Sequence, residues 1–468
     1  PDRNGADYRD GPVTAQQRLA NGICRPLPKL TECARLSDLI RPIISAERPA
    51  MALAAPARLD AHFDGEPATV DAAAAPAVSV AGDVRITIYE AMPEVEREWR
   101  AFEQKADGTV FQSFDWLAAW QCHIGASAGV RPAIVVGRDG AGDILFLLPL
   151  AVHAAGSVRE LTWLGSVLCD YNGPLLAPDF PARIDRALFL ALWQDITRRL
   201  QANPRLQFDI VTLDKMPDRV GEQHNPLRCL GGTINPSGAY LTHLSGDWDS
   251  FYSAARSAAT RRRDRTKRKK LAEFGEIRFV SAATETELRT SLDTLIEQKA
   301  RSFARMGVAN LFAKPGHASF YRALASDPAT RSFVHVSRLD VGAEPAAVNM
   351  ALVHRGRYYH LLASYTDGDL ARFGPGAAHL HDLMRYAIEN GCRIFDFTIG
   401  DERYKRDWCD TELALYDYIA PATWRGALVA VPRLAGQKLK RWIKQTPVLW
   451  TAATRIREFR AGLRSKAD

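Results

Sequence analysis

The sequence predicts an α/β protein in which one module with a mixed sheet occurs twice, preceded by a disordered segment. Two stretches, 133–153 and 333–354, each read as an apolar strand, an arginine, a Gly-containing turn and a second apolar strand that ends in Val-His. Each hairpin precedes a further strand, a Gly/Pro loop, a helix of roughly four turns and a strand with Phe-Asp, at 207–215 and 393–405. Any two mixed α/β domains share part of this order, but duplication is the simplest interpretation.

Four segments follow from this pattern. Order begins at the alternating strand 83–90, and two helices follow it, the second with Ser113 as its N-cap. We expect disorder over 1–82, a first module over 83–245 with a scaffold or acceptor role, a second module over 246–420 that binds the donor and catalyses, and a basic amphipathic helical tail over 421–468.

Composition is that of a globular protein, with 47% hydrophobic and 25% charged residues in a chain of 468. The net charge of +7 permits an anionic partner without selecting one. Seven scattered cysteines without a C-x-x-C spacing favour a reducing cytoplasm. The longest apolar run, 144–156, is interrupted by Pro149 and is shorter than the ~20 residues that span a bilayer, so we interpret it as a core strand.

The N-terminal segment is rich in Ala, Pro and Arg and shows no steady periodicity, which is typical of disorder. The first methionine is Met51. One hypothesis is that Met51 is the true start of translation and that the upstream residues belong to an over-extended reading frame.

The second copy contains the pattern strand, Gly-rich loop, helix, strand, over 357–364, 372–377, 377–390 and 394–399. Gly374 and Gly376 would let a ligand approach the backbone, the free N–H groups of a helix start favour phosphate, and Arg372 would add a counter-charge. The alternative is a tight turn closed by Gly-Pro-Gly. The alternation predicts Tyr358, His360, Leu362 and Ser364 on one face of the first strand.

A charged segment follows the last strand of this module. The strand contains Asp396, and after Gly400 six of the seven residues 401–407 are charged, with Tyr404 as the exception. The first module has a sparser counterpart at the same place. Charges cluster where chemistry uses them, so we assign the chemistry to the second module.

These residues carry a resemblance. The stretch 359–408 resembles the core of the CelD-type acetyltransferases associated with cellulose biosynthesis, which are FemAB-like members of the GNAT (N-acetyltransferase) superfamily. The resemblance covers most of 83–420 and is sharpest over 357–408. It implies two GNAT-like (acyl-CoA N-acyltransferase) modules in tandem, with an acyl donor at the loop that opens the 377–390 helix.

The same resemblance implies a pyrophosphate-binding loop of the form Gln/Arg-x-x-Gly-x-Gly/Ala. Arg372 and Ala377 match its first and sixth positions, whereas Pro375 stands where the fourth position has glycine, flanked by Gly374 and Gly376. Because of this departure the donor stays open: acetyl-CoA, a longer acyl-CoA, or the aminoacyl-tRNA that Fem-type relatives use.

Acyl transfer of this kind needs a base for the nucleophile's proton and donors that face the developing oxyanion. Asp401 is the candidate base or a ligand for a cationic acceptor, and Lys405 a ligand for the acceptor or the donor phosphates. Asp396 would orient Lys405 or Tyr404. Second-rank candidates on the neighbouring strand are His360 and Ser364. A structural role is the alternative for each.

Two basic segments remain. The run 261–270 is more simply a solvated helix than a site for tRNA or anionic lipid, because it lacks interleaved aromatic residues. The C-terminal tail more simply packs on its own domain, with peripheral membrane attachment as the sharper alternative. We expect no metal, because the histidines lack H-E-x-x-H and His379 and His381 point to different faces of a helix.

Three functions are therefore open. The first is an acyltransferase that uses acyl-CoA to acylate an amine or hydroxyl of a small molecule or polysaccharide-related acceptor. The second is a Fem-type transferase that uses aminoacyl-tRNA, which the basic run favours. The third is a non-catalytic accessory protein of cellulose or exopolysaccharide production. The third gains if Asp401 and Lys405 do not face the glycine loop.

Overall fold

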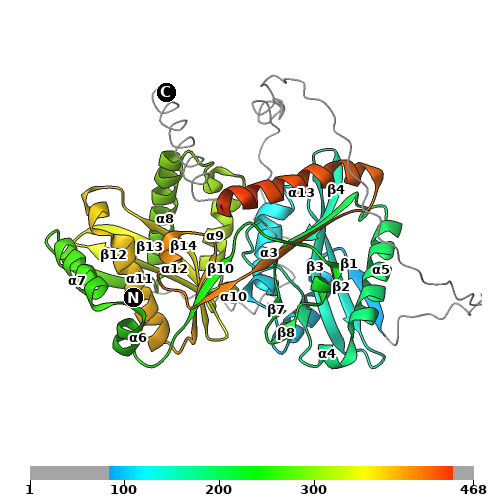
Figure 1. Cartoon of the computed structure of the whole chain (residues 1–468), viewed down its shortest axis with the longest axis horizontal. Coiled ribbons are helices and arrows are strands. Elements are labelled where there is room, and N and C mark those ends of the chain that lie inside the picture. The colour runs from blue at the N-terminus through cyan, green and yellow to red at the C-terminus, as the bar shows by residue number, and fades with distance from the viewer. Residues whose placement is uncertain (1–83, 166, 446–468) are drawn as a thin grey trace, which may run out of the picture. The chain divides into compact units, whose positions relative to one another are not determined.

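A computed structural model describes residues 84–165 and 167–445 (Figure 1). The predicted disordered segment 1–82, Met51 and the end of the C-terminal tail lie outside the described residues. The described residues form two mixed sheets with helices packed on them, and the predicted α/β class with a repeated module is confirmed. Within these residues no helix is both long and apolar enough to cross a membrane.

The first sheet has the order β1-β2-β3-β4-β6-β17-β9, and β5 pairs with β3. Only the β4–β6 pair is parallel, and the other pairs are antiparallel. Its strands are β1 (Arg85–Tyr89), β2 (Arg131–Arg138), β3 (Ile144–Ala155), β4 (Val158–Trp163), β5 (Leu175–Leu176), β6 (Ile210–Pro217), β9 (Thr233–Ile234) and β17 (Leu415–Pro421). A small separate ribbon is formed by β7 (Arg219–Val220) and β8 (Gln223–His224).

The second sheet has the order β11-β12-β13-β14-β15-β10-β16, and again a single pair, β14–β15, is parallel. Its strands are β10 (Ala239–His243), β11 (Ile277–Ser281), β12 (Val334–Val341), β13 (Glu344–His354), β14 (Arg357–Tyr365), β15 (Ile394–Ile399) and β16 (Thr411–Leu413). The two sheets therefore share one topology, with four strands in sequence, a parallel neighbour and an antiparallel sixth strand.

The sixth strand of each sheet comes from a different place in the chain. β10 lies just before the other strands of the second sheet and pairs with β15 inside it, whereas β17 follows the second sheet and pairs with β6 of the first. The second sheet is therefore built from the continuous run β10 to β16, and the first sheet is completed by a strand from beyond that run. The chain crosses between the two sheets after β9 and again after β16.

The helices cover both faces of each sheet. They are α2 (Met92–Glu103), α3 (Phe114–Trp120), α4 (Phe180–Arg183), α5 (Arg186–Ala202), α6 (Trp248–Ala255), α7 (Ala258–Ala272), α8 (Glu285–Met306), α9 (His317–Ser326), α10 (Pro328–Arg331), α11 (Pro375–Glu389), α12 (Arg403–Arg406) and α13 (Trp424–Gln445). Short helical turns are η2 (Val110–Gln112), η3 (Gln121–Gly125), η4 (Pro226–Leu230), η5 (Leu311–Ala313) and η6 (Asp369–Phe373).

One hydrophobic core is shared by the two halves. It joins α2 and α3 to α8 and α9, and α3 and α9 lie side by side in Figure 1. Trp116 of α3 meets Phe320 of α9 edge to face, with ring centroids 5.1 Å apart. A second core lies between the first sheet and α5, and a third between the second sheet and α11.

Both fifth strands contain a bulge at the corresponding place. Lys215 in β6 has φ +54° opposite the register shift in β17, and Thr398 in β15 has φ +60° opposite the shift in β10. A left-handed backbone at a β-branched residue such as Thr398 costs about 1–3 kcal/mol, so surrounding contacts must hold it. The bulge turns the end of each strand away from the regular ladder.

A third bulge corrects a prediction about β14. The register shifts between Tyr359 and Leu362, so His360 and Leu361 oppose a single residue of β13. Beyond this point the alternation is reversed. His360 lies beside the rings of Phe395 and Phe397 in the core under α11, whereas Ser364 donates to Gln298 of α8 on the opposite face. The predicted common face for His360 and Ser364 is wrong, because an inserted residue changes the phase of a strand.

Asp396 is fully buried and forms the centre of a network that joins the two halves. Its Oδ1 accepts hydrogen bonds from the Tyr171 hydroxyl at 2.8 Å and the Thr398 amide at 2.7 Å. Its Oδ2 accepts from Nε of Arg357 at 2.8 Å and lies 2.6 Å from Nη2 of the same guanidinium. Tyr171 belongs to the first half of the chain, so this carboxylate connects that half to both strands of the parallel pair.

We predict that Asp396→Ala lowers the free energy of unfolding by about 3–5 kcal/mol, because it leaves the Arg357 guanidinium buried without its anion. Tyr171→Phe keeps the ion pair and should cost about 1–3 kcal/mol. Urea unfolding followed by circular dichroism measures both. The matched control is Asp293→Ala, which breaks an exposed pair with Arg322 and should cost less than about 1 kcal/mol. Equal losses for Asp396→Ala and Asp293→Ala would contradict the structural role of the network.

Candidate active site

The parallel strands β14 and β15 separate beyond their first three residue pairs. The ladder ends at Tyr359–Asp396, although β14 continues to Tyr365 and β15 to Ile399. Past this last pair, the facing backbone edges of the two strands no longer bond to each other. Edge peptide groups of this kind can bind an extended ligand that carries amides. The opening leads toward the start of α11.

The start of α11 is shaped by the glycine loop that the sequence analysis selected. Gly374 adopts a left-handed conformation with φ +68°, and Pro375 occupies the first helical position, where a missing N–H carries no cost. Ala377 and Ala378 both donate to the carbonyl of Gly374, and no acceptor for the Gly376 amide is recorded among the described residues. A Cβ at Gly376 would lie 3.1 Å from the Tyr365 ring, so glycine keeps this approach open.

Two cations lie at this helix start. The ammonium of Lys267, from α7, is 3.9 Å from the position that a Cβ on Gly374 would take, and Arg372 is exposed on η6. α7 is held beside the loop by the ring contact of Phe274 with Phe373, whose centroids are 5.7 Å apart. The sequence analysis did not identify Lys267, because only the packing of α7 on η6 brings it to the loop. Cations and a helix N-terminus together favour an anionic group.

Lys405 lies at the end of β15 and is only 4% exposed. Its ammonium donates to the carbonyl of Ile399 at 2.8 Å and lies 3.4 Å from that of Thr398, and it pairs with Glu402 at 3.0 Å. The bulge at Thr398 turns these carbonyls toward the lysine. Lys405 therefore carries a positive charge into a largely dehydrated position next to the strand opening.

Lys299 and His360 lie close to Lys405. Burial lowers the pKa of Lys299, Glu402 opposes this shift, and Lys405 adds to it. Burial also lowers the pKa of His360 to about 3, and the charges of Lys405 and Lys299 act in the same direction, so this imidazole is neutral at pH 7. Lys299 comes from α8, in a helical stretch without a motif, and the sequence analysis missed it.

The first half of the chain contributes Asp170 to the same place. This carboxyl hydrogen-bonds Thr398, and burial raises its pKa to about 6, although the charges of Lys215 and Lys405 oppose the shift. Lys215 sits on the bulge of β6 and donates to the carbonyl of Cys169 at 2.5 Å. The two bulges thus meet at one site. No local sequence signal marks Asp170, since its neighbours come from distant segments.

The other predicted residues lie around this group. Asp401 accepts from the Gly238 amide and the Tyr240 hydroxyl, both at 3.4 Å, on the β10 side of β15 rather than in the opening. Tyr404 is 39% exposed with its ring against Phe397, and burial raises its pKa. The Ser364 hydroxyl donates to Gln298 on the far face of the sheet. The structure thus brings together Lys405 and His360, and it places Asp401 and Ser364 away from them.

Histidines are numerous in this half, but they are held by protein contacts. His379 lies 3.1 Å from the Ser337 hydroxyl, and His335 stacks on Tyr386 with centroids 4.1 Å apart. Burial lowers the pKa of both imidazoles. Within residues 84–165 and 167–445, no three His, Cys, Asp or Glu side chains are grouped so as to hold a metal ion.

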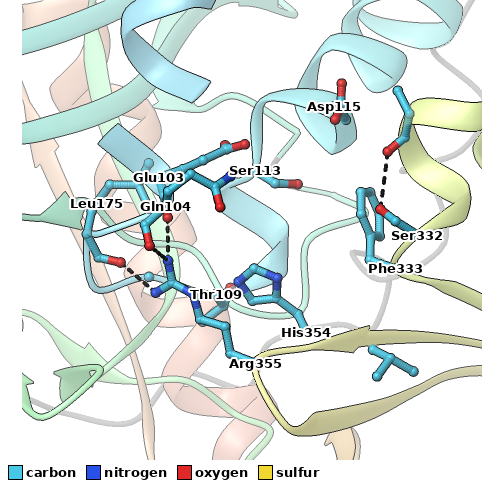
Figure 2. A pocket seen from close by; sticks show the side chains of 14 residues that line it. Glu103, Gln104, Thr109, Ser113, Asp115, Leu175, Ser332, Phe333, His354 and Arg355 are labelled. Atoms are coloured by element: carbon cyan, nitrogen blue, oxygen red, sulfur yellow. Dashed lines mark hydrogen bonds between the residues drawn. The ribbon is translucent and has the colours of Figure 1, made fainter. Parts of the chain in front are cut away.

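A polar pocket of about 280 Å³ lies near the N-terminal end of β14, at the end away from the glycine loop (Figure 2). The eight residue steps of β14, at about 3.3 Å each, separate its two ends by roughly 26 Å. The pocket lies where the β13–β14 turn meets the end of α2, and Arg355, with φ +49° in this turn, donates to the carbonyls of Glu103, Gln104 and Ala106. Arg355 thereby satisfies the C-terminal carbonyls of α2.

Glu103 is the titrating group of this pocket. Its carboxylate accepts the amide of Phe114 at 2.8 Å and caps α3, while burial raises its pKa to about 7 and Asp115 adds to the shift. His354, labelled beside Arg355 in Figure 2, has its pKa lowered to about 4 by burial and by the guanidinium charge.

One known family matches part of the second half of the chain. Residues 258–406, from the start of α7 to the end of α12, match the model of a family described as an acetyltransferase (GNAT) domain. This segment is therefore similar to a GNAT acetyltransferase domain, in agreement with the superfamily part of the resemblance, whereas its CelD-type part stays a prediction. No curated protein matches the sequence.

Several solved structures align with the chain at low identity, and FemX shares its fold. The crystal structure of FemX aligns with a TM-score of 0.50 and 12% identity, over 72% of this chain and 97% of that one. L-PGS from Bacillus licheniformis aligns with a TM-score of 0.43 and 11% identity, over 72% and 96%. A tandem GNAT protein from the clavulanic acid biosynthesis pathway aligns with a TM-score of 0.41 and 12% identity, over 72% and 98%.

We predict that Glu103 makes folding less stable as the pH rises from about 4.5 to 7. Its folded pKa of about 7 exceeds the ordinary value of 4.5, so the folded chain binds more protons in this window. The contribution is complete below pH 4.5 and lost above pH 7, with a slope of at most about 1.4 kcal/mol per pH unit.

Glu103→Gln keeps an acceptor for the Phe114 amide but does not titrate. Urea unfolding at pH 5, 6, 7 and 8 should therefore show that the free energy of unfolding of the wild type, minus that of the variant, falls as the pH rises. A difference that is constant across this range would show that Glu103 has an ordinary pKa.

Proposed function

We propose that this protein is an acyltransferase that moves an acetyl or longer acyl group from acyl-CoA to an amine or hydroxyl of a small molecule or a polysaccharide-related acceptor. The observation that carries the proposal is the opening between β14 and β15 beside the start of α11, inside the segment that matches a GNAT domain. An acyl donor that carries amides and a pyrophosphate fits an opening with backbone edges at its side and a helix N-terminus at its end.

The residues for the donor follow from this fit. The donor's pyrophosphate would lie on the loop Arg372–Ala377, with the Gly376 amide, Lys267 and Arg372 as its nearest donors and charges. Gly374 and Gly376 allow close approach, and Ala377 keeps the surface of the first turn small. The amides of the donor's extended arm would pair with the free edge of β14 beyond Tyr359.

The chemistry would take place at the end of β15. The acceptor nitrogen or oxygen attacks the thioester carbon, a C–N or C–O bond forms, the C–S bond breaks, and the thiol leaves with a proton. A base works best when its pKa is near the working pH, and Asp170, at about 6, fits this better than His360, at about 3. Asp170 is therefore the proposed base.

Cations have the complementary role. Lys299 and Lys405 lie close enough to His360 to affect its pKa, and both would attract an anionic acceptor group or the developing oxyanion. Asp396, through the Thr398 amide, and Asp401, through the start of β10, would act as positioning residues. Tyr404, exposed beside the opening, is a candidate for acceptor contact, and Ser364 is not assigned a role in the reaction.

The Fem-type alternative, with aminoacyl-tRNA as donor, is favoured by one observation. α7 exposes a row of cations next to the glycine loop, and these are Arg262, Arg263, Arg265, Lys267, Lys269 and Lys270. A phosphate backbone would suit such a surface. The CelD-type assignment, a role in cellulose or exopolysaccharide production and a cytoplasmic location are further parts of the proposal, and a non-catalytic accessory role is an alternative to it.

We predict that coenzyme A binds the full chain and that Arg372→Ala with Gly376→Val lowers its affinity by at least about tenfold. The valine would contact the Tyr365 ring and close the approach to the amide, and the alanine removes a phosphate-facing charge. Isothermal titration measures the affinity. The control is Arg289→Ala with Gly436→Val, an exposed arginine and a glycine with open space around it. No binding of coenzyme A at millimolar concentration would reject the acyl-CoA donor and leave the Fem-type alternative.

We predict that Asp170→Asn lowers kcat by roughly 100-fold or more and leaves coenzyme A affinity unchanged, because it removes the base but not the donor loop. Release of free thiol from acetyl-CoA in the presence of a panel of amines and amino sugars measures turnover. Asp401→Asn serves as the comparison and should change kcat by less than about tenfold, as expected of a positioning residue. The opposite order of effects would return the role of base to Asp401.

A further inference from the structure

α13 packs on the first sheet with its small and polar residues facing inward. Ala430 is buried beside Val158 and Ile210, and Gly426 lies so close to the Asp209 carbonyl that no side chain fits there. Nη1 of Arg433 pairs with the nearly buried Glu160 at 2.8 Å. Farther along, Gln437 donates to Asp417 of β17 at 2.9 Å. The inner face is thus fixed by close backbone approach and polar contacts.

The outer face carries the large apolar side chains. Trp424 is 74% exposed, Leu428 69%, Val431 70% and Leu439 54%. Their spacings of four, three and eight residues put them on one side of a helix. This arrangement is the reverse of a usual surface helix, which turns its large apolar residues into the core. Figure 1 shows α13 as the red helix on the outside of the first sheet.

The same helix has an unbalanced charge. Residues 424–445 contain no Asp or Glu, and their six cations are Arg425, Arg433, Lys438, Lys440, Arg441 and Lys444. Arg433 is neutralised by Glu160 and Arg425 donates to the Ser157 carbonyl, whereas Lys438 is exposed near Leu439. The stripe formed by Trp424, Leu428, Val431 and Leu439 is therefore part of a helix that is strongly positive.

We propose that α13 docks the protein on an anionic membrane surface, with its apolar stripe in the lipid interface and its cations at the headgroups. An amphipathic helix with Trp and Leu on one face and Lys and Arg beside them binds in the plane of the interface, and each cation near an anionic leaflet adds to the attraction. The exposed apolar area and the positive charge of α13 thus both favour an anionic membrane as its binding partner.

A second copy of the chain is the less fitting occupant. A symmetric contact would place two α13 helices face to face, each positive and without an acidic residue of its own, so their cations would repel each other. An apolar peptide would cover the stripe but bring no counter-charge to the exposed Lys438 beside it. A lipid surface with anionic headgroups satisfies both.

Flotation of the full chain with vesicles tests the proposal. We expect binding to vesicles of 30% phosphatidylglycerol in phosphatidylcholine and at least about tenfold weaker binding to pure phosphatidylcholine. Leu428→Glu with Val431→Glu should reduce binding to the anionic vesicles by at least about tenfold, because it puts two anions into the stripe. Circular dichroism and unchanged coenzyme A affinity show that the variant is folded.

The matched control is Met306→Glu with Val308→Glu, two exposed apolar residues in the second half of the chain, which should leave vesicle binding unchanged. An equal loss in this control would reduce the effect to net charge and overturn the proposal. Absence of wild-type binding to anionic vesicles would also overturn it. So would light scattering that finds a dimer which the α13 variant dissociates, without any vesicle binding, because the stripe would then be a contact between copies.

Discussion

The buried carboxylate of Asp396 is the interaction on which the site depends. It belongs to the last residue pair of the β14–β15 ladder, where the strands begin to separate. It accepts hydrogen bonds from Tyr171 of the first half, from Arg357 of β14 and from Thr398 of β15. Its bond to the Thr398 amide holds a strained bulge, and the bulge turns the two carbonyls that fix Lys405. Burial of this charge costs desolvation free energy, and what it provides is a fixed geometry. A single carboxylate holds the opening, the end of β15 and the tyrosine of the first half in place.

The duplication explains why the site needs both halves. Each sheet has one parallel pair and a fifth strand with a left-handed bulge residue, Lys215 in one and Thr398 in the other. In the second half the bulge precedes the charged segment, whereas in the first half it brings Lys215 and the Asp170 loop to the same place. In the proposed function the first module is therefore more than the scaffold that its plainer sequence indicates, since it supplies Asp170. Because a sheet of this kind exposes its polar groups where the strands diverge, two such sheets that meet there can combine their charges.

Local pattern predicted much of this fold, and tertiary contact decided the remainder. Periodicity and glycine spacing predicted the two hairpins, the α11 helix and its loop, and the Phe-Asp strands, all of which depend on residues close in sequence. Nothing local marks the one-residue bulge at His360–Leu361, which changes the face of Ser364, or the return of β17 to the first sheet. Lys299, Lys267 and Asp170 were missed for the same reason, since each reaches the site from a segment whose own pattern is ordinary. Asp396 stands out in the sequence as an acid inside an apolar strand, but its recorded contacts are with Arg357, Thr398 and Tyr171 rather than with Lys405 or Tyr404, and Tyr171 lies 225 positions away.

The orientation of α13 follows from the return of the chain to the first sheet through β17 rather than from its own sequence. An amphipathic pattern states that a helix has an apolar face, but it does not state which face the rest of the protein will cover. β17 leaves the second half just after the charged segment and enters the first sheet beside β6, so α13 must begin against the Asp209 carbonyl. Only the face with Gly426 and Ala430 approaches that closely, and the large residues are left outside. The connection that puts the apolar stripe on the surface is thus the connection that follows Lys405, with only β16 and β17 between them in the chain. A protein whose candidate active site and exposed stripe are joined by so short a segment has a direct way to hold its reaction close to whatever surface the stripe binds.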